Sequence, residues 1–479
     1  MALFTTGSSA PKLPAQTAAY GVAPGWSLPP DQGANRIDLS IGFVLAAVAI
    51  FVRFSYLHEI LASLAGAKLY LLYVFGVPAL LAVALTGGVG RVLQGRPALY
   101  WIGFTLWIAL AVPFSSWRGG SVQTLTGYLK TGPAVLFTIA GLTTNWRQCR
   151  GMMWALALAA SVDLATASLF EKEAGGRLGL RLEFGSIQNA NDFAAHLLLL
   201  LPFLVWVVLS SRFLVLRLLA LPGVVVGFYL ILRTASRGAA LAMIVAAAFF
   251  LWRATTRQRI AFLVLAPLAL AILLAAVPRD ALTRMRSFSA DEAAADISAI
   301  AREAAASGAI REYLFRKGIT YALEHPLFGV GPGQFSDYEG SHEQTIGTHG
   351  YYRVPHNSFT QVASECGIPA LLLFVAGIVS TLRLLNATYR EARRRPDCQD
   401  IGTAAFCVML AIIGFCTATT FLSSAYAFQL PGMAGLAIAV ARAAKQEFAA
   451  RAVSTGAPEP PWAARRQFAV GGSFGAVAS

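Results

Sequence analysis

The chain has 479 residues, of which 56% are hydrophobic and only 13% are charged, and its mean hydropathy is +0.60. A soluble core of this size needs much less apolar surface, so the composition excludes an ordinary globular cytosolic protein and predicts an integral membrane protein. The net charge of +14 has no basic stripe interleaved with base-stacking aromatic residues, which excludes nucleic acid as a partner and favours contact with anionic membrane lipid.

Residues 1–38 are rich in Ala, Pro, Gly and Ser, and they contain no early apolar core. They predict a disordered cytoplasmic tail rather than a cleaved signal peptide. Apolar windows long enough to cross a hydrocarbon layer of about 30 Å then recur along the chain. The fold class predicted is an all-α polytopic membrane protein with about twelve transmembrane helices. The twelve windows are 39–57, 67–86, 98–114, 122–143, 151–170, 193–209, 213–232, 238–252, 259–277, 358–382, 401–421 and 424–441.

These windows divide the chain into a membrane part with nine spans at 39–277, a hydrophilic segment at 278–357, and a second membrane part with three spans at 358–441. Residues 442–479 predict another disordered cytoplasmic tail. Lys and Arg are concentrated in alternate connections and in both tails, and short basic loops resist translocation. We therefore expect both termini in the cytoplasm and the segment 278–357 on the outer side, between spans 9 and 10.

The segment 278–357 predicts two short surface helices, at Asp291–Ala306 and Ile310–Glu324. The second places Ile310, Tyr313, Leu314 and Tyr321 near one face. Pro326 disfavours helical backbone at His325 and therefore ends the second predicted helix at Glu324. Gly329 to Tyr351 then predicts a loop, whose glycine-rich start lacks the lysine and helix of a phosphate-binding loop and indicates a tight turn.

His356, Asn357 and Glu365 lie at the start of the tenth window. A neutral imidazole accepts a proton near pH 7, so His356 is a candidate general base, with a structural hydrogen bond as the alternative. A carboxylate entering a bilayer is costly, so Glu365 needs either a buried partner or a function. His325 lies on the same outer side, just upstream of the turn.

Arg237 and Arg181 stand at the start of the eighth window and just before the sixth. A planar guanidinium binds phosphate oxygens in pairs and stays charged, so both are candidates for a lipid pyrophosphate. The alternative for each is snorkelling at the interface or an ion pair. Asn189 and Asn191 follow Arg181 on the same side.

His342, His349 and His356 recur every seven residues, but this spacing matches no helical ligand pair and no zinc pattern. We expect no metal at these residues and no other cofactor. The five cysteines are scattered, so no disulfide framework follows from them.

These motifs, in this order on a polytopic chain, resemble the superfamily of O-antigen ligases and Wzy-type O-antigen or exopolysaccharide polymerases. The resemblance runs from about Arg181 to Phe374. Ala190 stands where the family usually has proline, and Ala370 where it often has glycine. Both departures concern helix geometry more than chemistry.

The resemblance implies a metal-independent, inverting membrane glycosyltransferase with a GT-C-type helical bundle, in a bacterial inner membrane and with its site in the periplasm. Its donor would be a glycan on undecaprenyl pyrophosphate. His356 would orient or deprotonate the acceptor hydroxyl, and Arg237 and Arg181 would neutralise the pyrophosphate. The residues expected to contact substrate are Asn357, Glu365, His325, Asn189 and Asn191.

The acceptor stays open between a growing glycan, a lipid A core sugar and a protein hydroxyl, with a glycan preferred and polymerase slightly favoured over ligase. Other polysaccharide assembly proteins are further candidate partners. A transporter or flippase is the alternative from another class, and Lys130 is the residue that suits it best. The long segment after the ninth span and the charges at the outer interface disfavour that alternative.

Overall fold

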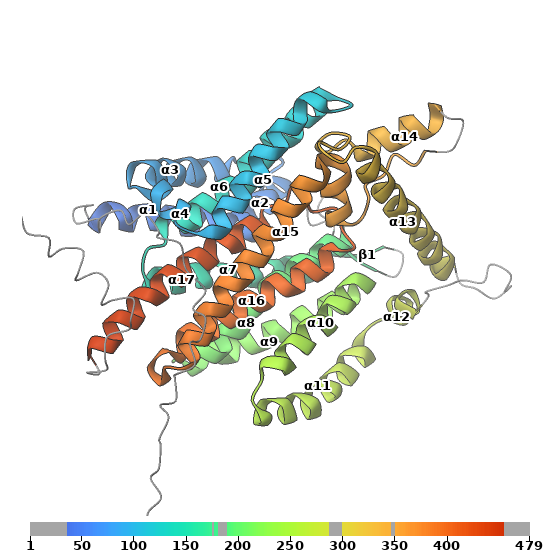
Figure 1. The fold of residues 1–479 in the computed structure, drawn as a ribbon. Coiled ribbons are helices and arrows are strands. Elements are labelled where there is room, and N and C mark those ends of the chain that lie inside the picture. Colours follow the sequence, from blue (N-terminus) through green and yellow to red (C-terminus); the bar gives the residue numbers. More distant parts are fainter. Residues whose placement is uncertain (1–35, 175–176, 181–188, 287–298, 346–349, 455–479) are drawn as a thin grey trace, which may run out of the picture.

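The structure is a computed structural model that describes residues 36–174, 177–180, 189–286, 299–345 and 350–454. The described chain is helical apart from turns and one small hairpin, in which β1 (Glu171–Ala174) pairs with β2 (Arg177–Leu180) in antiparallel register. This hairpin differs from the all-helical prediction. Figure 1 shows it beside the helical bundle.

The helices follow the apolar windows closely. Every predicted window falls on a helix, with boundaries that differ by several residues. In chain order they are α1 (Arg36–Phe54), α2 (Leu57–Ala65), α3 (Leu71–Leu85), α4 (Gly88–Leu93), α5 (Arg96–Ala111), α6 (Arg118–Leu142), α7 (Trp146–Leu169), α8 (Ala190–Ser210), α9 (Leu214–Arg233), α10 (Arg237–Arg253), α11 (Thr256–Ala276), α12 (Arg279–Arg286), α13 (Ala299–Glu324), α14 (Phe335–Thr345), α15 (Ser358–Arg393), α16 (Gln399–Thr419) and α17 (Gln429–Ser454), with short 3₁₀ turns at Val112–Phe114 and Pro396–Cys398.

Polar residues set where several of these helices begin. Asn145, Asn189, Ser236 and Asn357 each accept a hydrogen bond from a backbone N–H in the first turn of α7, α8, α10 and α15. Thr255 and Gln258 form a reciprocal capping box at the start of α11. Such caps satisfy backbone donors that have no partner inside the helix.

Seven helices of the described chain are long and apolar enough to cross a membrane, and the bent pair α1–α2, which turns by 66°, makes an eighth. The chain is therefore a multi-span membrane protein. Of the other predicted windows, α3 and α10 are short, with 15 and 17 residues, and α6 and α17 are long enough but less apolar. The seven spans are Arg96–Phe114, Trp146–Leu169, Ala190–Ser210, Leu214–Arg233, Thr256–Ala276, Ser358–Arg393 and Pro396–Thr419.

One continuous apolar core joins α1, α5, α6, α7, α8, α15, α16 and α17. Trp101 and Phe104 of α5 meet Phe374 of α15 in it, with ring centroids 5.4 Å apart in both pairs. Helix α8 is the most enclosed span, with 78% of its window buried, whereas α11 has none of its window buried and lies at the edge of the bundle beside α10 (Figure 1). An apolar helix with no covered face is suited to contact with lipid.

The segment between α11 and α15 is more helical than predicted. Residues 291–298 of the first predicted helix lie outside the described residues. The predicted division between Asp291–Ala306 and Ile310–Glu324 is wrong, because α13 runs without a break from Ala299 to Glu324, and the loop predicted from Gly329 to Tyr351 contains α14. The predicted apolar face of α13 is confirmed. Leu314 and Tyr321 pack there against Phe335 of α14.

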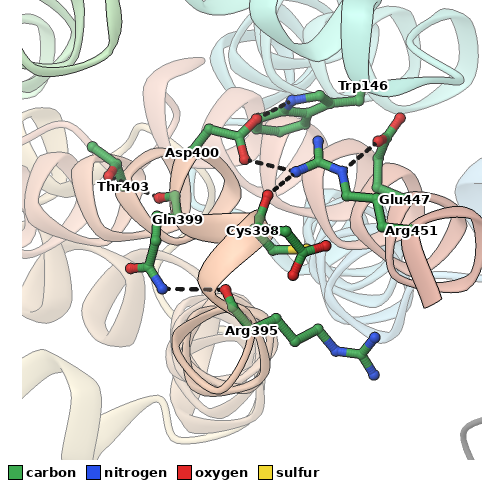
Figure 2. Close-up of polar contacts among 9 residues, drawn as sticks. Trp146, Arg395, Cys398, Gln399, Asp400, Thr403, Glu447 and Arg451 are labelled. Carbon is green, nitrogen blue, oxygen red and sulfur yellow. Dashed lines mark hydrogen bonds and ion pairs between the residues drawn. The ribbon is translucent and has the colours of Figure 1, made fainter. Parts of the chain in front are cut away.

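Helix α17 continues to Ser454, beyond the predicted tail boundary at 442. Its extension is held by a polar cluster at the ends of α7, α16 and α17, shown in Figure 2. Arg451 lies between Asp400 and Glu447, with nitrogen–oxygen distances of 3.2 and 3.0 Å, and Asp400 also accepts a hydrogen bond from the Trp146 indole at 2.8 Å. These contacts join three helices at the end of the bundle opposite His356.

Candidate active site

The first turn of α15 is fastened to the connection between α16 and α17, residues 420–428, which we name the 420–428 segment. The His356 backbone N–H donates to Ser423 Oγ at 2.8 Å, and the Ser358 hydroxyl donates to the Leu422 carbonyl at 2.7 Å. Ser424 in turn donates its N–H to Ser358 Oγ at 2.9 Å. The predicted base His356 is therefore set against a segment that the sequence did not single out.

Asn357 has a structural position in this arrangement. Its side chain accepts hydrogen bonds from the N–H groups of Phe359 and Thr360, at 2.9 and 3.0 Å, and so caps α15. The amide oxygen is occupied by this cap, and Asn357 does not line either cavity described below.

Glu365 is almost fully buried, with 1% exposure. Its carboxylate accepts a hydrogen bond from the Tyr426 hydroxyl at 2.6 Å and another from the Gly333 N–H at 2.9 Å. The predicted partner of this carboxylate thus exists. Glu365 lies behind the cavity wall, where it orients Tyr426 of the 420–428 segment and anchors the glycine-rich turn.

The glycine-rich turn packs backbone against backbone on a break in α15. Gly367 has φ +83° and ψ 174°, and a Cβ placed on it would stand 2.1 Å from the Leu327 carbonyl oxygen. Val330 and Gly331 donate their N–H groups to the carbonyls of Ser364 and Glu365, at 2.8 and 2.9 Å. The tight turn predicted at 329–333 is confirmed, and its role is to support α15.

Three guanidinium groups approach one another, and one of them, that of Arg311, also acts on His356. They belong to Arg237 at the start of α10, Arg284 on α12 and Arg311 on α13. Arg237 and Arg311 each have a pKa below the ordinary value, because burial disfavours their charge and the neighbouring arginines repel it. Arg284 is only 7% exposed. Like charges held together in this way attract an anion, although the nearby Asp192 carboxylate offsets part of the charge of Arg311.

His356 lies within the field of this cluster. Burial is the largest influence on its pKa, followed by the positive charges of Arg311 and Arg353, and together they lower the pKa from 6.5 to about 4. The imidazole is therefore neutral at neutral pH and has a lone pair available to accept a proton.

Two adjacent cavities open beside these groups. The smaller one is lined by Asn191, Ser236, Arg311 and Leu422, among others, and so connects the arginine cluster with the 420–428 segment. The larger one has a volume of about 490 Å³ and shares Leu422 with the first. The larger cavity has a mixed polar and aromatic lining that includes Arg53, Tyr56, Tyr128, Asp192, Tyr426 and Gln429.

Strained backbone gathers at these cavity walls. Five described non-glycine residues have positive φ. Of these, Tyr56 (φ 48°) lines the larger cavity, Ala235 (φ 50°) precedes Ser236 of the smaller one, and His356 (φ 53°) contacts Ser423 of the larger one. The left-handed region is costly for residues with a Cβ, and such residues cluster at functional sites.

The remaining predicted residues are placed as follows. Asn191 lines the smaller cavity, whereas Asn189 is exposed and caps α8 by accepting a hydrogen bond from the Asn191 N–H at 2.9 Å. His325 is exposed and pairs with the Tyr338 hydroxyl at 3.1 Å, away from both cavities. Arg181 and His349 lie outside the described residues. Within the described ranges, no three His, Cys, Asp or Glu side chains gather as a metal site.

Sequence reasoning missed Arg53, Asp192, Arg284, Arg311 and the 420–428 segment. Asp192 had a visible signal, because a carboxylate directly before an apolar window is costly. Arg311 and Arg284 had none, since each sits on an amphipathic helix where a charge is ordinary and only the fold brings them together.

Residues 222–375 match the family model described as O-Antigen ligase. This segment of the chain is similar to the O-antigen ligase family. The match runs from α9 into α15 and includes Arg237, Arg284, Arg311 and His356, so the resemblance predicted from the sequence is confirmed. No curated protein matches the chain. The matched residues thus include the arginine cluster and His356, whereas every residue that lines the larger cavity lies outside them.

Proposed function

We propose that this protein is a membrane glycosyltransferase that moves a glycan from undecaprenyl pyrophosphate to a sugar hydroxyl, with inversion at the anomeric carbon and without a metal or other cofactor. The observation that carries the proposal is the convergence of Arg237, Arg284 and Arg311 from three separate helices, with Arg311 both in the wall of the smaller cavity and close enough to His356 to act on its charge.

The arginine cluster has the chemistry to hold the donor pyrophosphate. In the transfer, the bond between the anomeric carbon and the pyrophosphate oxygen breaks, and its electron pair passes to that oxygen. Guanidinium groups stabilise the developing charge without a metal ion. Arg311 also lines the smaller cavity, whose volume of about 10 Å³ admits no more than a water molecule, so the donor phosphates have to displace side chains there to reach Arg311.

His356 is the proposed base. As the acceptor oxygen bonds to the anomeric carbon, its proton passes to the neutral imidazole and then to solvent. A pKa of about 4 makes the free imidazole a weak base. A bound pyrophosphate offsets the charge of Arg311, so donor binding raises the pKa of His356 and strengthens the base when it is needed.

The larger cavity is the proposed acceptor site. Its size lies in the range of small-ligand sites, and its tyrosines, Asp192 and Gln429 offer both apolar faces and hydrogen-bonding groups to a polyhydroxylated sugar. We infer a glycan or a lipid A core sugar as acceptor. Asn191 fits the boundary between donor and acceptor, since it lines the smaller cavity and precedes Asp192.

This function places the protein in the bacterial inner membrane, with the site at the periplasmic face and both termini in the cytoplasm. Its partners are then membrane lipid, the lipid-linked donor and other polysaccharide assembly proteins. Polymerase and ligase remain alternatives within the same chemistry, because both join a lipid-linked glycan to a sugar hydroxyl.

The test is a gel analysis of surface glycan and lipid-linked intermediates in a deletion strain complemented with wild type, His356→Ala or Arg237→Ala. Both variants insert in the membrane and lose transfer. Accumulation of single lipid-linked units indicates a polymerase, and accumulation of long lipid-linked chains indicates a ligase. Normal activity of both purified variants contradicts the mechanism, and trapping of the intermediates at the cytoplasmic face indicates a flippase instead.

A further inference from the structure

A buried pair of titratable side chains lies beneath the larger cavity and has no part in the proposed transfer. Asp163 of α7 is 0% exposed and His196 of α8 is 1% exposed. Asp163 Oδ2 and His196 Nε2 are 3.3 Å apart. His196 is six residues into α8, about 9 Å along a helix of 1.5 Å rise. Ionisable groups inside a membrane helix are costly and generally have a function.

The contacts of His196 fix the position of its hydrogen. Nε2 lies 2.7 Å from the Phe54 carbonyl oxygen, at the bend between α1 and α2, and also faces the Asp163 carboxylate. Both neighbours are acceptors, so Nε2 carries the hydrogen. Nδ1 instead faces the Gln429 amide nitrogen at 3.5 Å, which is a donor, so Nδ1 carries a lone pair. His196 is thus neutral in this arrangement.

Gln429 links this pair to the cavity. Its Nε2 donates to the Tyr56 hydroxyl at 3.3 Å, and both Gln429 and Tyr56 line the larger cavity. Gln429 Oε1 is buried and accepts no hydrogen bond from any residue that the structure describes. A half-turn of the amide brings this oxygen toward His196 Nδ1 and Tyr56 together.

The charges around the pair favour one further proton. Asp163 has a carboxylate oxygen 3.3 Å from His196 Nε2, and the other charged or titratable groups in the neighbourhood of Tyr56 are Arg53, Glu59 and Asp192. Arg53 is directed onto the Phe428 ring, 4.3 Å from its centroid. A proton on Asp163 finds no acceptor, because Nε2 is itself a donor. A proton on His196 Nδ1 can be donated to Gln429 Oε1 once the amide has turned, and the resulting imidazolium lies beside the Asp163 carboxylate.

We propose that Asp163 and His196 form a proton-binding site in the membrane domain, and that the Gln429 amide transmits its state to the Tyr56 hydroxyl in the cavity wall. Without the extra proton, Tyr56 accepts from Gln429 and donates its own hydrogen into the cavity. With the proton on Nδ1, the amide turns, Tyr56 donates to Gln429, and its oxygen accepts from a ligand hydroxyl. Tyr56 is then a positioning residue for the sugar acceptor, and this last step rests on the proposed function.

The first experiment needs no activity. Histidine-selective ¹⁵N NMR of the purified full-length protein, with His196→Asn used for assignment, reports which nitrogen of His196 carries hydrogen. At alkaline pH we expect hydrogen on Nε2 alone, and on acidification a second hydrogen on Nδ1. In Asp163→Asn the second protonation should need a proton concentration at least roughly tenfold higher, because a close opposite charge is lost.

Asp400→Asn at the opposite end of the bundle is the control and leaves the His196 titration unchanged. Gln429→Leu provides a second route if Asp163→Asn does not fold, since it removes the acceptor for Nδ1 and also makes protonation of His196 harder. A His196 that carries hydrogen on Nδ1 at alkaline pH, or that titrates identically in Asp163→Asn or Gln429→Leu, overturns the proposal.

The second experiment measures glycan transfer against acceptor concentration across pH. The acceptor KM of the wild type follows the His196 titration, and Tyr56→Phe removes this pH dependence while kcat keeps its own profile. A KM that is equally pH-dependent in Tyr56→Phe overturns the role of Tyr56. If no transfer occurs under any condition, the proposed function fails, while the NMR titration still decides the proton site.

Discussion

At the scale of single residues, Gly367 shapes the site most directly. Its φ of +83° with ψ 174° belongs to a region used almost only by glycine, and its neighbour across the gap is the Leu327 carbonyl rather than a movable side chain. The break lets the first turns of α15 turn toward the 420–428 segment. Substitution here acts on the backbone and on the packing of the glycine-rich turn at once.

Gly367→Ala should destabilise the protein by about 1–3 kcal/mol from backbone strain alone, with an added cost from the contact with Leu327. The measurement is the thermal unfolding midpoint in detergent. Gly76→Ala is the matched control, because no atom lies within 4 Å of the added methyl group and alanine in a helix interior is favourable by roughly 0.5–1 kcal/mol. Equal midpoints for the two variants would show that the break in α15 tolerates a side chain.

The lowered pKa of His356 gives a second prediction at this scale. The pKa of about 4 is below 6.5, so the unfolded chain takes up the proton first as pH falls. The contribution of His356 to stability is complete above pH 6.5 and is lost as pH falls toward 4. Arg353→Gln removes one of the repelling charges, so an NMR titration should show the pKa of His356 moving up toward 6.5. Arg316→Gln, on the far part of α13, should leave it in place.

At the scale of elements, α13 carries arginines on two different faces, one toward the site and one toward solvent. Arg311 lines the smaller cavity and lies among the arginines, whereas Arg316, one and a half turns later, pairs with Glu312 at the surface with its side chain 76% exposed. The same helix thus offers a site arginine and a surface arginine. Their comparison separates the loss of a specific guanidinium from a general loss of positive charge.

Arg311→Ala should lower the transfer rate by about 10²–10³-fold, the usual cost of removing one group that stabilises developing charge. Arg316→Ala should stay within about twofold of wild type, because exposed ion pairs contribute little. The assay is transfer of a labelled lipid-linked glycan by each purified variant. Comparable losses in both variants would remove Arg311 from the donor site.

The cluster in Figure 2 stabilises the packing of α17 against α7 and α16 and lies far from the cavities, so it should affect stability and not transfer. Asp400→Ala leaves the Trp146 indole and Arg451 without this acceptor, so the unfolding free energy should fall by about 1–2 kcal/mol, with transfer unchanged. Arg394→Ala, whose side chain is 79% exposed, is the control and should shift the unfolding midpoint very little. A loss of transfer without a loss of stability in Asp400→Ala would contradict this division.

At the scale of the whole molecule, the sequence predicted the parts that depend on local pattern. Apolar length located the helices, and His356 and Arg237 were recognised because a base and an arginine at helix starts are visible in one dimension. Arg284, Arg311 and the 420–428 segment escaped because their meeting is produced by packing of distant helices. Asn357 and Glu365 show the converse limit, since spacing alone does not separate a cap or an anchoring carboxylate from a ligand-binding group.

The arrangement of basic residues predicts which end of the molecule faces the cytoplasm. After replacement of the natural cysteines, which are buried or half-buried in the described chain, Glu324→Cys and Arg147→Cys place single thiols at exposed positions on opposite sides. In intact cells a membrane-impermeant maleimide should modify Glu324→Cys and leave Arg147→Cys unmodified until the membrane is opened. Labelling of Arg147→Cys alone would reverse the predicted orientation. Labelling of both variants in intact cells would reject it.

The hydrogen bonds around α15 have a mechanical consequence. The glycine-rich turn, the first turns of α15 and the 420–428 segment are tied to one another through Ser358, Glu365 and the backbone of residues 330–333. They therefore form one tied unit, which holds the backbone of His356 and the Tyr426 hydroxyl in fixed positions. Helix α11, by contrast, has no buried side chain, so the edge of the bundle at α11 is held less tightly than this unit.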